Sequence, residues 1–115
     1  MPSTTTPSRR IIDEVSTWPG VEVGPGDRGA SVAVRLGRRE LGHLHGDRAA
    51  HFSFPKPVWR ELERDGRIEE HPVFPGAVGP AARRIEGDAD VRAVIELLRL
   101  NYERMVARHG VAART

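Results

Sequence analysis

The sequence predicts a single small α+β domain, with an antiparallel sheet of about four or five strands covered by about three helices. Two patterns lead to this prediction. The first half of the chain holds short segments in which apolar and polar residues alternate, and turn residues separate them. Other segments, above all the last twenty or so residues, repeat apolar side chains at helical spacing. A chain of 115 residues is long enough to bury one hydrophobic core.

The strand signals begin at residues 21–23 and are clearest at 30–36, where alanine, valine and leucine occupy alternate positions. Gly37-Arg38 is a plausible hairpin turn, and residues 39–45 form the returning strand. Segments with a weaker strand pattern are 49–54, which alternates only partly, 67–71 and 81–85. The expected order is therefore helix, three strands, helix, one or two strands and helix.

Three segments are expected to be helical. The first runs from Ser8, a candidate cap, to about Thr17, and the second from Pro57 to Asp65, before Gly66. The third begins at the candidate cap Asp88 and closes at Gly110. Its apolar stripe consists of Val91, Val94, Ile95, Leu98, Tyr102, Met105 and Val106.

Composition limits the class of protein. We expect a polar disordered tail at residues 1–8, one domain at 9–110 and a C-terminal tail at 111–115. The absence of cysteine excludes disulfides, thiolate metal sites and cysteine nucleophiles. No apolar run approaches the roughly 18 residues of a membrane span, and the first residues lack the apolar segment of a secretory signal. We therefore expect a cytoplasmic protein without a membrane partner.

The charge pattern argues against nucleic-acid binding. The pI of about 9.9 is high because the cations are nearly all arginine, whereas the net charge is only +2. Acidic residues are interleaved with the arginines, and the only basic pairs are Arg9-Arg10, Arg38-Arg39 and Arg83-Arg84. This distribution is typical of a solvated mixed surface.

The most informative segment is Gly42-His43-Leu44-His45-Gly46-Asp47. In an extended strand, Leu41, His43 and His45 share one face and Glu40, Gly42 and Leu44 share the other. The sequence does not decide which of these faces meets the core.

One hypothesis for this segment is a metal site. Two imidazoles on one strand face can present two nitrogens to an ion such as Zn²⁺, and Asp47 could complete the set with a carboxylate. His51 and His71 are further candidates for the same polar site. No motif with fixed metal-ligand spacing, such as H-E-x-x-H, is present.

The interpretation that we favour from the sequence needs no cofactor. His43 and His45 would then be partly buried and hydrogen-bonded to the backbone, Asp47 or Glu40, and their face would be structural or would form a small-ligand pocket. The candidate ligand-binding residues are His43, His45, Asp47, His51 and His71.

Catalysis is left open by the sequence. General acid–base chemistry by His43 or His45 with Asp47 is feasible because histidine titrates near neutrality. No serine lies in a G-x-S-x-G turn, so a nucleophilic serine enzyme is not indicated.

Several segments together resemble small bacterial proteins of the luciferase domain family, whose function is unknown. They are Trp18–Val23, Gly42–Asp47, Phe54-Pro55, Gly66-Arg67, His71–Pro75 and Leu97–Tyr102. The resemblance spans roughly residues 11–107 and implies no catalytic residues. Relatives usually carry a Ser-Gly-Trp-like step after the last proline, whereas residues 76–85 contain no tryptophan, which would weaken a ligand surface built on it.

The expected role is a small ligand-binding or accessory module centred on residues 42–47. The alternative is a small metal-dependent or histidine-based enzyme that uses His43, His45 and Asp47. A third possibility is weak DNA binding, since the element order is similar to YjbR/MmcQ-like double-wing proteins, some of which are thought to touch DNA. The oligomeric state is not predicted.

Overall fold

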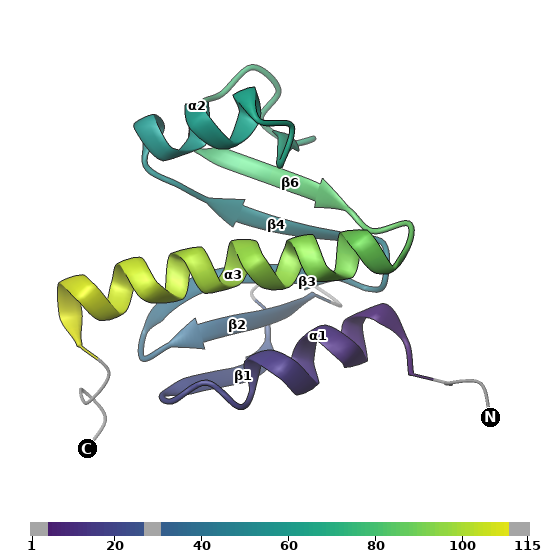
Figure 1. The fold of residues 1–115 in the computed structure, drawn as a ribbon, viewed down its shortest axis with the longest axis vertical. Coiled ribbons are helices and arrows are strands. Elements are labelled where there is room, and N and C mark those ends of the chain that lie inside the picture. Colours follow the sequence, from purple (N-terminus) through teal and green to yellow (C-terminus); the bar gives the residue numbers. More distant parts are fainter. Residues whose placement is uncertain (1–4, 27–30, 111–115) are drawn as a thin grey trace.

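The computed structural model contains a six-stranded antiparallel sheet with helices packed across one of its faces (Figure 1). It describes residues 5–26 and 31–110, so residues 1–4 and 111–115 of the expected tails lie outside the described part. The α+β class is confirmed, and the strand number is slightly higher than expected. No helix among the described residues is both long enough and apolar enough to cross a membrane.

The strands lie in the order β1-β2-β3-β4-β6-β5, and every neighbouring pair is antiparallel. Their bounds are Val21–Pro25 (β1), Val32–Leu36 (β2), Arg39–His45 (β3), Ala49–Ser53 (β4), Glu69–Glu70 (β5) and Pro80–Arg84 (β6). Four strands rather than three precede the second helix. The segment 49–54 alternates only partly because β4 is covered on both faces: Ala50, His51 and Phe52 are all buried.

The helices are α1 (Pro7–Val15), α2 (Lys56–Arg64) and α3 (Asp88–His109). The cap of α1 is Thr6 rather than Ser8, because the Thr6 side chain accepts a hydrogen bond from the Arg9 N–H at 3.2 Å. The cap of α3 is Gly87, so Asp88 is its first helical residue, and Gly110 ends it as expected. α1 stops at Val15, two residues before the expected end.

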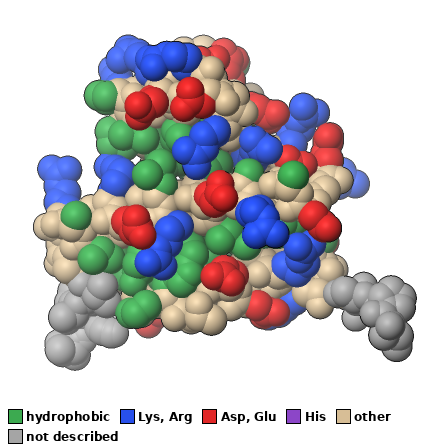
Figure 2. Space-filling view, in the orientation of Figure 1, with side chains coloured by type: hydrophobic (Ala, Val, Ile, Leu, Met, Phe, Trp, Pro, Cys, Tyr) green, Lys and Arg blue, Asp and Glu red, His purple; other side chains and the backbone are tan. Residues whose placement is uncertain are grey.

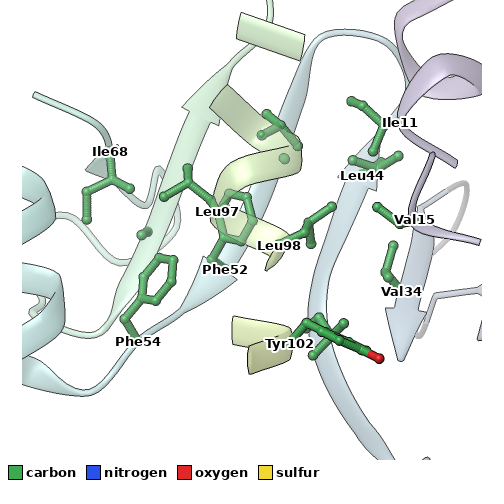
Figure 3. Close-up of a cluster of buried hydrophobic side chains, with 14 of the residues drawn as sticks. Ile11, Val15, Val34, Leu44, Phe52, Phe54, Ile68, Leu97, Leu98 and Tyr102 are labelled. Atoms are coloured by element: carbon green, nitrogen blue, oxygen red, sulfur yellow. The ribbon is translucent and has the colours of Figure 1, made fainter. Parts of the chain in front are cut away.

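One hydrophobic core joins the sheet to all three helices. Leu97 and Leu98 of α3 are fully buried against strand residues such as Phe52 and Leu44, as Figure 3 shows. Gly42 lets the helix approach, since a Cβ there would lie 2.8 Å from Leu98 Cδ2 and 2.9 Å from Phe52 Cδ1. The face of β3 that carries Gly42 and Leu44 is therefore the core face.

A β-bulge interrupts β3 beside this core. Val34 pairs with Gly42, whereas Arg35 pairs with Glu40, so Leu41 is an extra residue in the strand. Leu41 is buried in the core, and its carbonyl accepts a hydrogen bond from Asn101 Nδ2 at 3.0 Å. The expectation that Leu41 shares a face with His43 and His45 is therefore wrong, because the extra residue shifts the alternation.

Candidate functional site

Four histidines gather on the sheet face opposite the core. Gly42 and Leu44 of β3 meet the core, so the alternating His43 and His45 point to the other face. His51 of β4 pairs with His43, and its ring centroid lies 5.3 Å from that of His43 and 4.2 Å from that of His45. On the helix-covered face drawn in Figure 2, no histidine is seen among the described residues.

Three of these imidazoles form a group that could hold a metal ion. His43, His45 and His51 each offer one ring nitrogen, and these nitrogens lie within 4.8 Å of one another. The grouping depends on the hairpin: a three-residue connection between His45 and Ala49, with Gly46 at φ 59°, fixes the register that places His51 opposite His43.

Asp47 does not lie in this group. Its Oδ1 accepts a hydrogen bond from the Ser8 N–H at 2.9 Å, in the first turn of α1. That bond is the main reason why the pKa of the Asp47 carboxyl lies below its ordinary value. In this structure Asp47 therefore anchors α1 to the hairpin.

Glu40 holds one of the imidazoles in place. His43 Nδ1 lies 2.7 Å from Glu40 Oε2 and donates to the carboxylate, which lowers the pKa of Glu40. In neutral His43 the other ring nitrogen, Nε2, is then free of a proton. The sequence named Glu40 only as a hydrogen-bonding partner on the opposite face, since the bulge that turns it toward His43 has no local signal.

His51 is a buried residue of the site without a hydrogen bond to the described part of the protein. It is only 8% exposed, yet within the part of the chain that the structure describes neither of its ring nitrogens has a hydrogen-bonding partner. Burial, followed by the nearby imidazoles of His45, His71 and His43, lowers the pKa of His51 to about 4. Burial also lowers the pKa of His45, so both side chains are neutral at pH 7.

His71 adjoins the group but is bonded differently. Its Nδ1 accepts the Val73 N–H at 3.1 Å, so that nitrogen carries no proton and Nε2 carries it. A neutral His71 in this tautomer is a hydrogen-bond donor rather than a metal ligand. Burial lowers the pKa of His71, which favours this neutral form.

A cavity of about 310 Å³ connects these groups on the open face. Its lining consists of Ser31, Glu40, His43, His45, His51, His71, Val73 and Phe74. The volume is at the lower end of the range for small-molecule sites. Phe74, which the sequence did not single out as a site residue, is 50% exposed on the cavity wall.

These features define a small α+β domain with an imidazole-lined cavity on an open sheet face. The model of one protein family, described as Luciferase domain, matches residues 38–101, which is more than half of the chain. The chain therefore belongs to the luciferase domain family. The matched segment contains all four histidines of the cavity. No curated protein and no solved structure matches the chain.

Proposed function

We propose that this domain binds a divalent transition metal ion, of which zinc is the best example, through His43, His45 and His51. The observation that carries the proposal is the group of His43, His45 and His51, whose ring nitrogens lie within 4.8 Å of one another and in which His51 has no protein partner among the described residues. No buried side-chain nitrogen or oxygen among the described residues lacks a hydrogen-bonding partner, so the unpaired His51 nitrogens reach the cavity, where an ion could bind them. The sequence favoured a pocket without a metal, and the position of His51 is what favours the ion.

The chemistry of the three side chains fits such an ion. Zinc binds neutral imidazole, and the lowered pKa values of His45 and His51 keep both rings neutral at pH 7. Three nitrogens on one tetrahedral zinc lie about 3.3 Å apart, because each Zn–N bond is about 2.0–2.1 Å. The three nitrogens, which lie within 4.8 Å of one another in the structure, would have to move closer together to reach that spacing.

Glu40 would act as a positioning residue. A carboxylate that accepts the Nδ1–H of a ligating histidine fixes the tautomer and raises the basicity of the other nitrogen. Loss of such a partner typically weakens metal binding about 10- to 100-fold. Three protein ligands leave a coordination position for water or a small ligand, and a bound ion there would polarise what it holds.

The test is zinc binding by untagged protein purified without chelator, with metal content measured by elemental mass spectrometry and affinity by calorimetry. We expect one zinc per wild-type chain and a loss of at least tenfold in affinity for His45→Ala and His51→Ala. His45 is exposed, so its variant tests the site even if His51→Ala fails to fold. Glu40→Gln should bind one zinc more weakly.

Two matched controls make the result specific. His109→Ala removes an exposed histidine at the end of α3, and Asp47→Ala removes the carboxylate that lies outside the group. Both should bind zinc like wild type. Absence of zinc, cobalt and nickel binding by wild type, or an equal loss in His109→Ala, would overturn the proposal.

Nucleic-acid binding gains no specific support. Arg9, Arg10, Arg83 and Arg84 each form an ion pair with a carboxylate. On the face shown in Figure 2, arginine and acidic side chains are interspersed rather than gathered into a basic patch.

A further inference from the structure

The groups on one side of the cavity lie in a row from polar to apolar. The ring centroid of His71 lies 4.2 Å from that of His51, and the centroid of Phe74 lies 5.1 Å from that of His71. A small molecule at the His51 end of this row would therefore reach His71 first and Phe74 next.

His71 contributes a donor of fixed position to this row. Because the Val73 N–H occupies Nδ1, the proton of the neutral ring is on Nε2. Within residues 5–26 and 31–110, no side chain or backbone group accepts a hydrogen bond from that nitrogen. His71 is 8% exposed and lines the cavity, so its donor can serve an oxygen of a bound molecule.

Val73 and Phe74 supply an apolar wall that is held in place. They are 60% and 50% exposed, and they are the exposed large hydrophobic residues of the described chain. The Phe74 N–H donates to the His71 carbonyl at 3.0 Å, and the Ala77 N–H donates to the Phe74 carbonyl at 3.1 Å. These turn bonds fix an apolar surface beside the polar groups of the cavity.

We propose that the cavity binds a small amphiphilic carboxylic acid. One carboxylate oxygen would coordinate the ion on His43, His45 and His51, and the other would accept the Nε2–H of His71. The apolar part of the acid would pack on Val73 and Phe74. The inference rests on the proposed function, because the ion supplies the positive charge that neutral imidazoles lack.

The volume of the cavity limits the acid to a small one. A cavity of about 310 Å³ has room for one ring or a short chain. The Glu40 carboxylate, which would repel an anion, is hydrogen-bonded to His43 Nδ1. That bond to a donor reduces the repulsion that a bound acid would meet.

The test uses zinc-loaded protein and two probes. Binding of 4-fluorobenzoate is followed by fluorine NMR, and binding of acetate is measured by its displacement of 4-fluorobenzoate. We expect 4-fluorobenzoate to bind about tenfold more tightly than acetate, since burial of an aromatic ring contributes at least 1.4 kcal/mol. Phe74→Ala should remove most of this difference and leave acetate unchanged. His71→Phe should weaken both probes by a similar factor while one zinc per chain remains, and His109→Phe is its control.

The outcomes separate this inference from the proposed ion site. If zinc binds but neither probe does, or if both probes bind equally and Phe74→Ala changes nothing, the ligand class is overturned and the ion site stands. If zinc does not bind, the ion site is overturned. The zinc-free protein could then still bind 4-fluorobenzoate. If His71→Phe and Phe74→Ala both weaken that binding, the carboxylic acid is supported as the ligand class without the ion site.

Discussion

Leu44 and His45 are neighbours in β3, yet they belong to two very different faces of the same sheet. Leu44 is 1% exposed in the core under α3, whereas His45 is exposed at the cavity. On the core face, polar groups are paired, as Asn101 is with the Leu41 carbonyl. On the open face, His45 and His51 have no hydrogen-bonding partner among the described residues. The comparison shows that the apolar core and the imidazole-lined cavity lie on opposite faces of the same strands.

The largest expected effect is that of Leu44→Ala, and truncation of its neighbour His45 is the comparison. Leu44→Ala should lower the free energy of unfolding by about 2–5 kcal/mol, because it leaves a cavity in the core. His45→Ala should change it by less than about 0.5 kcal/mol. Urea unfolding, with chelator present so that no bound ion adds stability, measures both. Equal losses for the two variants would contradict the division between faces.

A smaller loss is expected when the close approach of α3 is disturbed. A Cβ on Gly42 would lie 3.0 Å or less from Leu98, Phe52 and the His51 carbonyl. Gly42→Ala should therefore lower the free energy of unfolding by about 1–3 kcal/mol, as overpacking does. Gly24→Ala in β1 is the matched control, because nothing lies within 4 Å of its added Cβ. If Gly42→Ala left the free energy of unfolding unchanged, the core face would tolerate added volume.

The charged pair on the core side should give a pH-dependent effect. Two donors hold the pKa of Asp90 below its ordinary value. They are the Glu86 N–H and Arg83 Nη2, which lies 2.7 Å from Asp90 Oδ1. A lowered pKa in the folded state stabilises the protein above the unfolded pKa of about 3.9, and this contribution is lost as the pH falls.

Asp90→Ala should therefore lower the free energy of unfolding by about 1–2 kcal/mol at pH 7. Its difference from wild type should shrink below about pH 4. Urea unfolding at pH 7, 5 and 3 measures this, and Asp13→Ala in the exposed pair with Arg9 serves as the control. A difference that grows toward low pH would reverse the inferred sign.

The smallest effect is expected for Asp47→Ala. It removes the acceptor of the Ser8 N–H and should lower the melting temperature less than Asp90→Ala does. Its zinc affinity should stay within about twofold of wild type, because Asp47 lies outside the three-histidine group. Loss of zinc in this variant, with the fold intact by circular dichroism, would restore the alternative hypothesis made from sequence, in which Asp47 completes the ligand set.

Features with a local pattern were predictable. The strand at 30–36 and the long last helix follow from the spacing of their own apolar residues, and both are present as β2 and α3. β4 was harder to predict because its residues are buried on both faces, which removes the alternation of polar and apolar residues. The bulge at Leu41 could not be predicted, since its carbonyl is held by Asn101, sixty positions away.

In the candidate site, too, the part with a local sequence pattern was predictable and the part that depends on distant contacts was not. The pair His43 and His45 is visible in the sequence, and the structure brings His51 and His71 to it through strand pairing. Asp47 is next to the pair in sequence but lies at the turn, where it faces α1 instead. Which of these residues bind a ligand stays a prediction.

The open position of the histidine group has a consequence for rates. None of the described helices covers His45, so an ion could enter and leave without any opening of the core. Its residence time would then depend on bond breaking at the imidazoles rather than on global unfolding. A chelator should therefore strip the ion quickly and leave a folded apoprotein that reloads at once.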